Sequence, residues 1–382
     1  MREGWVEKKL GNLCVVLDSQ RKPVAKINRK KGIFPYYGAN GLLDYVDDYI
    51  FEGKYVLLGE DGANWDSNAS SSYIVDGKIW VNNHAHVIKV NNLLNDEYLV
   101  YYLNYKDLNK YISGAIIKKL TQSSLKEINI EYPDLSFQEK IVSELDKITE
   151  MISKYDEQLN ELDKLSQSIF YEMFGDPIEN EKGWEVKTLK NISEKITSGN
   201  NAKLATGTYK SEGIPYFRCQ NVWKNRIDFK DMVYIDEETN QKLKSSVLKH
   251  NDLLITKIGR INTENSSLGR VSIYVGEDFK ANLSGNLCFI RLLDTVNPIF
   301  VLNIMISNYF RDYIRRTTVG GTDKRALKSP QIGRFPIILP PLPLQQSFAR
   351  KIEAIEAMRS KVREAKKEAE TLLAARMQYW FE

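Results

Sequence analysis

Residues 136–174 read SFQEKIVSELDKITEMISKYDEQLNELDKLSQSIFYEMF and decide the fold. Apolar side chains recur along this stretch in alternating steps of four and three residues, at Ile141, Leu145, Ile148, Ile152, Tyr155, Leu159 and Leu162. Gly and Pro are absent until Gly175 and Pro177, and Ser136 with Glu139 fits a capping box at the start. A helix of this length would span about 58 Å, more than an ordinary domain helix. The stretch therefore predicts one long helix whose narrow apolar seam needs a partner.

The same pattern returns near the end of the chain, at an offset of 207 residues. The aligned pairs run without a gap: Pro133/Pro340, Gln138/Gln345, Leu145/Ile352, Ile148/Ile355, Leu165/Leu372 and Phe174/Phe381. Arg359 and Lys366 interrupt the second seam at two positions. Residues 136–174 carry a net charge of −5 and residues 343–382 a net charge of +2, so the two helices favour pairing with each other over self-pairing.

The parts between these helices repeat more loosely. Gly4-Trp5 matches Gly183-Trp184, and Pro35-Tyr36-Tyr37 matches Pro215-Tyr216-Phe217. Segments rich in apolar and β-branched residues predict strands, and two further segments predict helices. The predicted strands are 54–59, 72–75, 79–81, 85–90, 252–257, 269–275 and 287–292, and the predicted helices are 97–109 and 299–316.

These features predict an α+β fold in which two pseudo-two-fold-related domains are separated by two long helices that form an antiparallel coiled coil. Only nine residues, 175–183, join the first long helix to the second domain, so the second helix has to run back along the first. The predicted parts are a first domain (1–135), a first spacer helix (136–174), a second domain (175–342) and a second spacer helix (343–382).

Composition narrows the class of protein. The three cysteines, Cys14, Cys219 and Cys288, are scattered, which favours a reducing compartment without disulfides. The N-terminus lacks the apolar core of a signal peptide, and no apolar run is long enough to span a membrane. We therefore expect a soluble cytoplasmic protein. Residues 1–135 are neutral overall, whereas residues 175–342 carry a net charge of +7, which favours an acidic partner such as nucleic acid.

Catalytic patterns are weak, so the sequence predicts no catalytic residue and no metal site. There is no phosphate-binding loop of the G-x-x-x-x-G-K-[ST] type. Asn297-Pro298-Ile299-Phe300 lacks the second Pro of the loop that amino-methyltransferases use, and the pattern is best explained by chance. His84 and His86 have no third ligand at a suitable spacing, which favours polar contacts on a strand over metal binding.

Three groups of residues suit contacts with DNA. Two Gly-containing loops that end in adjacent cations occupy equivalent places in the two halves, and they contain Ser113, Gly114, Lys118 and Lys119, and Gly320, Gly321, Thr322, Lys324 and Arg325. The second group follows the aromatic strands, with Tyr36, Tyr37 and Asn40, and Arg218, Gln220 and Asn221. The third group is Lys257 and Arg260, with Glu60, Asp61 and Asn64 in the corresponding loop of the first half. The alternative for each group is an ordinary solvated loop or a turn that its side chains cap.

The whole chain resembles the specificity subunit of type I restriction-modification systems. The resemblance rests on the two openings Gly4-Trp5-Val6-Glu7-Lys8-Lys9-Leu10 and Gly183-Trp184-Glu185-Val186-Lys187-Thr188-Leu189, on the Pro–x4–Gln entries to the long helices and on the twofold repeat. It implies that each domain is a target recognition domain that reads one half of a split site in double-stranded DNA. It also implies a non-catalytic subunit whose helices separate the two domains and dock methyltransferase (modification) subunits, expected as two copies.

In such a complex the partners bring the cofactors. S-adenosylmethionine would bind to the methyltransferase subunits, and ATP with Mg²⁺ to restriction/translocase subunits, with no cofactor in this chain and no membrane contact. The residues alone leave other classes open: a coiled-coil scaffold that joins two protein-binding domains, without a role in DNA binding, or a stand-alone nuclease or methyltransferase.

Overall fold

The structure is a computed structural model that describes residues 2–114, 118–201, 209–261, 263, 266–320 and 323–382. The chain forms two compact units. Unit 1 comprises the residues up to Gln158 together with Val362–Glu382, and unit 2 comprises Leu159–Lys361. Each unit thus contains one globular part and a portion of each long helix, whereas the sequence-based division set the helices apart as spacers. Among the described residues, no helix is apolar over a stretch long enough to cross a lipid bilayer.

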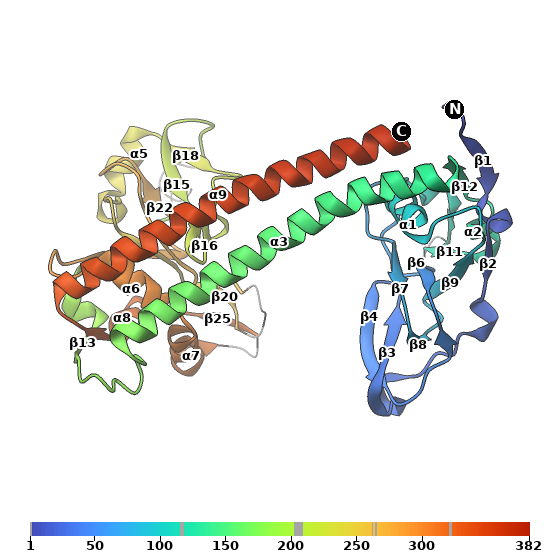
Figure 1. Ribbon diagram of the computed structural model, residues 1–382. Helices are drawn as coiled ribbons and strands as arrows, with labels where there is room; N and C mark the ends of the chain where they lie inside the picture. Colours follow the sequence, from blue (N-terminus) through green and yellow to red (C-terminus); the bar gives the residue numbers. More distant parts are fainter. Residues whose placement is uncertain (1, 115–117, 202–208, 262, 264–265, 321–322) are drawn as a thin grey trace. The chain divides into compact units, whose positions relative to one another are not determined.

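The two long helices are α3 (Leu135–Phe174) and α9 (Leu342–Phe381), each of 40 residues (Figure 1). They run antiparallel in both units, as predicted. In unit 1, Glu144 of α3 forms an ion pair with Arg376 of α9. Asp156, which lies further along α3, contacts Lys366, which comes earlier in α9; the distance is 2.6 Å. In unit 2, the Arg359 guanidinium lies 2.6 Å from the Asp163 carboxylate.

A buried glutamine fixes the start of each long helix, which explains the repeated Pro–x4–Gln pattern. Gln138 accepts a hydrogen bond from the Asn95 backbone N–H at 2.8 Å and donates to the Pro133 carbonyl at 2.9 Å. Gln345 does the same with the Asn297 N–H at 2.9 Å and the Pro340 carbonyl at 2.7 Å.

The partners of the two glutamines begin short helices. Asn95 and Asn297 are the N-caps of α1 (Asp96–Tyr105) and α6 (Pro298–Met305). The Asn297-Pro298 dipeptide, which resembled part of a methyltransferase loop, is therefore the start of a helix.

Both units build their sheets in the same order. One sheet is antiparallel throughout and has four strands in both units, and we call it the larger sheet. It is β2 (Cys14–Val16), β9 (Ala85–Val90), β6 (Tyr55–Gly59) and β7 (Ser72–Val75) in unit 1, and β14 (Ser193–Ser198), β23 (Leu287–Leu292), β19 (Leu253–Thr256) and β21 (Val271–Ile273) in unit 2. The second sheet is β4 (Gly41–Val46), β3 (Lys31–Gly38), β8 (Lys78–Val81) and β5 (Phe51–Glu52) in unit 1, and β18 (Val233–Ile235), β15 (Ile214–Phe217) and β22 (Asn282–Leu283) in unit 2. The repeat in the sequence is thus a repeat of topology, and the predicted α+β class is confirmed.

Short elements complete each unit. A two-stranded ladder leads into each long helix, from β1 (Val6–Lys9) and β12 (Asn129–Tyr132) or from β13 (Glu185–Thr188) and β26 (Pro336–Leu339). Further short helices are α2 (Gln122–Lys126), α5 (Glu237–Lys242) and α8 (Ser329–Gly333), and a hairpin in unit 2 is formed by β16 (Val222–Trp223) and β17 (Arg226–Ile227).

The predicted helix 299–316 is corrected by the structure, which has two helices there. After α6, the chain leaves the helix at Ile306 and Ser307 and begins α7 (Asn308–Thr317). The Ser307 hydroxyl donates to the Ile304 carbonyl at 2.6 Å, so the Ser307 side chain hydrogen-bonds to the backbone at the end of α6. Unit 1 has only a short 3₁₀ turn, η4 (Asn109–Tyr111), at the corresponding place after α1.

Aromatic residues bury the C-terminal end of each long helix. In unit 1, Phe381 of α9 packs against Tyr98 and Tyr102, with ring centroids 5.5 and 5.7 Å apart. In unit 2, Phe174 of α3 packs against Phe300 and Phe348, at 4.9 and 5.3 Å. Because Phe174 and Phe381 are fully buried, the end of each helix is part of a domain core rather than a solvated tip.

Candidate nucleic-acid interface

In unit 2 the structure brings two groups of candidate residues together on one small sheet. This sheet consists of β20 (Ile258–Arg260), β25 (Lys324–Ala326) and β24 (Val319–Gly320). Arg260 lies opposite Lys324 in the ladder, and both Gly259 and Gly320 lie opposite Arg325. Arg260 and Lys324 are exposed, and the Arg260 guanidinium contacts Asp323 at 3.1 Å. Gly321 and Thr322 lie outside the described residues.

Unit 1 places its candidate hairpin in the same way. It consists of β10 (Ile112–Ser113) and β11 (Lys119–Leu120), with Gly114 at a positive φ of 97° and Lys118 exposed. The Leu120 N–H donates to the Glu60 carbonyl at 2.8 Å, and in unit 2 the Leu327 N–H donates to the Lys257 carbonyl at 2.7 Å.

These matching hydrogen bonds make Glu60 and Lys257 equivalent positions. Both lie where the central strand of the larger sheet meets the hairpin. An acid in unit 1 therefore stands where unit 2 has a cation.

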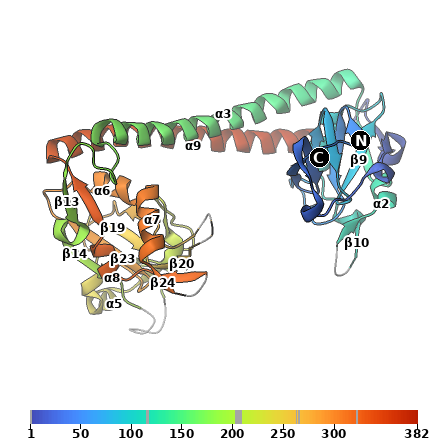
Figure 2. The ribbon, with the colours of Figure 1, turned by 90° about the horizontal axis from the view of Figure 1, so that it is seen from below.

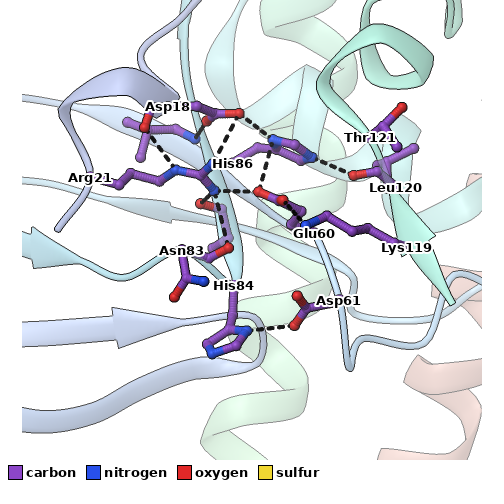
Figure 3. A network of polar contacts seen from close by, with 12 residues as sticks. Asp18, Arg21, Glu60, Asp61, Asn83, His84, His86, Lys119, Leu120 and Thr121 are labelled. Atoms are coloured by element: carbon purple, nitrogen blue, oxygen red, sulfur yellow. Dashed lines mark hydrogen bonds and ion pairs between the residues drawn. The ribbon is translucent and has the colours of Figure 1, made fainter. Parts of the chain in front are cut away.

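A buried ionic network joins the unit 1 hairpin to the larger sheet (Figure 3). The Lys119 ammonium lies 2.7 Å from one Glu60 carboxylate oxygen, and the Arg21 guanidinium lies 2.5 Å from the other. His86, which is fully buried, contacts Asp18 through Nδ1 at 2.6 Å and the Leu120 carbonyl through Nε2 at 2.8 Å.

The charges in this network are balanced. Burial alone would raise the pKa of Glu60, but Lys119 and Arg21 outweigh it and hold this pKa below its ordinary value. Asp18, Glu60 and His86 lie within 4.8 Å of one another and are residue types that bind metals. Their carboxylates, however, already contact Arg21 and Lys119. The geometry therefore supports an ion-pair network that holds the hairpin, and it leaves the Glu60 carboxylate unavailable to a base.

The equivalent place in unit 2 has different chemistry. In unit 1, the ladder between β6 and β9 places Leu58 opposite His86. The equivalent ladder in unit 2, between β19 and β23, places Ile255 opposite Cys288. The Lys257 ammonium donates to the Ser198 hydroxyl at 2.7 Å, and Ser198 in turn lies 3.0 Å from the Ser329 hydroxyl. Lys257 is half-buried, and its ammonium donates to a neutral hydroxyl, whereas Glu60 at the equivalent place in unit 1 contacts two cations.

The candidates in the turns divide into buried and exposed residues. Tyr36 is 1% exposed, with the Arg29 guanidinium 4.3 Å from its ring centroid, and Asn221 is fully buried. The Asn221 side chain accepts from the Arg218 N–H at 3.0 Å and donates to the Asp228 and Lys230 carbonyls at 3.0 and 3.2 Å. Tyr36 and Asn221 therefore hold turns together and offer no free edge to a base.

The remaining turn candidates lie at or near the surface. Asn40, Asn64 and Gln220 are exposed, and Tyr37 and Arg218 are half-buried. Asn40 donates to the Gly62 carbonyl at 3.0 Å, and Arg218 donates to the Asp231 carbonyl. Sequence reasoning missed Asp18 and Arg21, because a 3₁₀ turn rather than a motif places them beside His86.

Comparison with known proteins places this geometry in a family. A family model described as the type I restriction modification DNA specificity domain matches residues 2–164 and again residues 181–370. A putative type I restriction enzyme specificity subunit of Haemophilus influenzae is 29% identical over 381 residues, covering 94% of this chain and 89% of that protein. A type I restriction enzyme specificity subunit of Methanocaldococcus jannaschii is 22% identical over 390 residues, covering 96% and 90%.

Solved structures share the fold. The crystal structure of a type I restriction-modification S subunit from M. genitalium matches with a TM-score of 0.62 and 13% identity, over 99% of this chain and 96% of that one. A chain from a study of complex assembly and conformational transition of the type I system matches with a TM-score of 0.53 and 16% identity, over 100% and 98%. Since the family model matches both copies of the repeat, this chain belongs to the type I restriction-modification DNA specificity family, as a non-catalytic subunit that recognises DNA sequence.

Proposed function

We propose that the chain reads a bipartite target, with one segment of double-stranded DNA bound by each unit. The observation that carries this proposal is the repeated topology: each unit presents a hairpin with adjacent cations beside the central strand of its larger sheet. Lys118 and Lys119 occupy the hairpin in unit 1, and Lys324 and Arg325 occupy it in unit 2. Cations on such a hairpin suit phosphates and the acceptor edge of guanine.

The two segments should differ in sequence. Equivalent positions carry different side chains, namely Glu60 against Lys257 and His86 against Cys288. Recognition of two short DNA segments by one molecule acts as recognition of one longer, more specific target, because binding to the second segment takes place at a high effective concentration.

The long helices support the proposal that partner subunits dock on this chain. Met151 and Leu165 of α3 are 41% and 45% exposed, and Met358 and Leu372 of α9 are 54% and 47% exposed. These pairs are equivalent at the offset of 207 residues, so each helix presents the same exposed apolar stripe. Two equivalent stripes suit two copies of one partner.

The family suggests which partners these are. We assign the two stripes to methyltransferase subunits and expect restriction/translocase subunits to join the complex. S-adenosylmethionine would then bind to the methyltransferase subunits, and ATP with Mg²⁺ to the restriction/translocase subunits. The matched chain from the study of complex assembly in the type I system supports this view, because a chain of the same fold takes part in that assembly.

Selection from random duplexes tests the bipartite target. The full-length chain with its modification subunit is mixed with duplexes of random sequence, and the bound fraction is sequenced. We expect two blocks of preferred bases separated by a gap without preference. Lys324→Ala should weaken selection in one block only, since Lys324 belongs to unit 2, and Lys118→Ala should weaken the other. A single continuous block would overturn the proposal.

A further inference from the structure

The segment of unit 1 that joins β2 to β3 carries a high density of positive charge. Residues 22–31 read KPVAKINRKK and lead into β3, and we call them the basic arm. The basic arm holds five cations and no acid, whereas residues 1–135 as a whole are neutral. The rest of this part of the chain is therefore acidic overall, and a polyanion that approaches unit 1 is attracted to the basic arm.

Three of these charges are not neutralised by the protein. Arg29 is half-buried, and the four lysines are exposed: Lys22, Lys26, Lys30 and Lys31. The Arg29 guanidinium contacts the Asp44 carboxylate at 3.3 Å, and the Lys30 ammonium lies 4.0 Å from the Asp47 carboxylate. Among the residues that the structure describes, none forms an ion pair with Lys22, Lys26 or Lys31. Three ammonium groups of the basic arm thus remain available to an outside partner.

The basic arm is fixed on one face of the second sheet. The Trp80 indole N–H donates to the Lys22 carbonyl at 2.6 Å, and the Val24 N–H donates to the Tyr36 hydroxyl at 3.0 Å. Tyr36 and Trp80 are partners in the ladder between β3 and β8, so they lie on the same face. Arg29 donates to the Val24 carbonyl at 3.1 Å and places its guanidinium over the Tyr36 ring. A segment that is ordered in advance loses less conformational entropy when it binds.

The tip of the basic arm presents an isoleucine to solvent. The tip is a 3₁₀ turn, η3 (Lys26–Asn28), in which the Asn28 N–H donates to the Ala25 carbonyl at 2.8 Å. Ile27 is 92% exposed, more than any other large apolar side chain among the described residues, and Lys26 and Asn28 on either side are exposed as well. Lysines alone suit any solvated loop, but a fixed apolar tip between them indicates a surface that Ile27 enters.

The basic arm begins next to the candidate DNA-binding hairpin of unit 1. Arg21, the residue before the arm, contacts one carboxylate oxygen of Glu60, and Lys119 of the hairpin contacts the other (Figure 3). The hairpin strand β10 projects from unit 1 beyond its sheets (Figure 2). One carboxylate thus connects the hairpin to the start of the basic arm, so one duplex can contact both.

We propose that the basic arm binds the minor groove of the DNA segment at unit 1, with Ile27 inserted between neighbouring base pairs and the lysines on the flanking phosphates. Minor-groove proteins use cations and amides in the groove and insert an apolar side chain at a base step, which bends the duplex. A single 3₁₀ turn with one branched side chain suits this groove, which is about half as wide as the major groove. The inference rests on the proposed function and adds contacts that sense how easily the DNA deforms.

Lysines around an apolar tip also suit an anionic membrane surface. Two observations favour DNA: the basic arm is joined through Glu60 to a hairpin with adjacent cations, and the chain belongs to a DNA specificity family. The experiments therefore include vesicles of phosphatidylserine as a second probe.

The salt dependence of binding tests the lysines. The test variant is Lys22→Gln with Lys26→Gln, and the control is Lys8→Gln with Lys126→Gln, two exposed lysines on β1 and α2 of the same unit. Binding of the full-length chain to a duplex of mixed sequence is measured over a series of NaCl concentrations. The plot of the logarithm of affinity against the logarithm of salt should lose about 1.8 from its slope in the test variant and nothing in the control.

Ile27→Ser tests the apolar tip, because it leaves the charge of the basic arm unchanged. We expect duplex binding to weaken by about tenfold with an unchanged salt slope, since the buried apolar contact is lost. Ile27→Leu should bind like the wild type. The control is Val15→Ser, which removes an apolar side chain that is 61% exposed on β2.

Fluorescence detects the insertion directly. The duplex that the selection recovers is prepared with 2-aminopurine, which brightens when it is unstacked, at each adenine position in turn. The wild-type chain should raise the signal at one position in the block that unit 1 prefers, and Ile27→Ser should not.

The outcomes separate this inference from the proposed function. An unchanged slope in the lysine variant, or no rise in fluorescence with the wild type, overturns the minor-groove site. Ile27→Ser that binds the duplex as tightly as the wild type overturns it too. Binding to the vesicles that Ile27→Ser abolishes, with duplex binding unchanged, would assign the basic arm to a membrane instead. If the wild-type chain shows no salt-dependent binding to any duplex, it is the proposed function that fails.

Discussion

At the scale of single residues, Glu60 shows how one buried carboxylate can hold a surface hairpin. Its two oxygens contact Lys119 on the hairpin and Arg21 on a turn next to the sheet. We predict that Glu60→Gln loosens the hairpin by about 2 kcal/mol at neutral pH, because a charge-assisted contact to each cation is lost. Faster exchange of the Leu120 amide hydrogen, which donates to the Glu60 carbonyl, would report the change.

The effect should depend on pH in a defined direction. The pKa of Glu60 is lowered in the folded protein, so its contribution is present above the ordinary carboxyl pKa of 4.5 and is lost as the pH falls below that value. The difference between the wild type and Glu60→Gln should therefore shrink on acidification. Glu150→Gln, which removes an exposed acid of α3, is the control and should change little. A difference that stays constant with pH would contradict this account.

Individual residues also mark where sequence reasoning reaches its limit. The cations of the two hairpins could be predicted, because both occupy equivalent places in the repeat. The roles of Tyr36 and Asn221 could not, since an aromatic or an amide in a turn has the same sequence signal whether it is buried or exposed. The meeting of Asp18, Glu60 and His86 depends on strand register, and the three lie far apart in the sequence.

At the scale of elements, α3 and α9 combine an internal seam with an exposed stripe. Arg359 interrupts the apolar seam of α9, and in the structure it is buried and donates to the Ser166 hydroxyl at 3.0 Å and to the Leu162 carbonyl at 3.1 Å. A buried polar contact of this kind can fix the register of a helix pair. The exposed stripe is the part that remains available to partners.

The exposed stripes lead to a prediction about subunit stoichiometry. Met151→Lys with Leu165→Lys should remove one modification subunit from the complex, because each substitution places a charge in an apolar contact. Met358→Lys with Leu372→Lys should remove the other, and the four changes together should remove both. Light scattering of the purified complex measures the mass.

Matched substitutions on the opposite face of α3 provide the control. Ser153 and Gln167 are exposed and lie two positions beyond Met151 and Leu165, on the other side of the helix. Ser153→Lys with Gln167→Lys should leave the mass unchanged. Two bound modification subunits in every variant would show that the stripes are not docking sites.

The elements were predicted with unequal success for a physical reason. Each long helix shows its period over 40 residues, and the repeat confirms the period a second time. The break between α6 and α7 was missed because no Gly or Pro marks it anywhere in residues 299–316. Three strands of each larger sheet were predicted, because they are short, apolar and bounded by turns. The edge strands β2 and β14 were not predicted.

At the scale of the whole molecule, both long helices belong to both units, so their length should set the gap between the two DNA segments. We predict that one added heptad in α3 after Asp156, matched by one in α9 before Lys366, changes the tolerated gap and leaves the preferred bases unchanged. Those two residues contact each other, so the insertions keep the helices in register. Selection from random duplexes measures both quantities.

A single insertion is the informative control. A heptad added to α3 alone would move Phe174 out of the core that it shares with Phe300 and Phe348, and folding of unit 2 should suffer. Altered base preferences in the doubly extended protein would contradict the idea that the helices act only through length.

The buried glutamines at Gln138 and Gln345 have a consequence for how new specificities arise. The same hydrogen bonds fasten each long helix to its globular part, while the side chains at equivalent candidate DNA-binding positions, such as Glu60 and Lys257, differ between the two copies. A globular part from another protein that ends in the same proline and contains the same asparagine would form the same hydrogen bonds with the glutamine of the long helix. Recombination between genes of this kind would thus supply a new DNA-recognition domain in one event, with no compensating change in the rest of the protein.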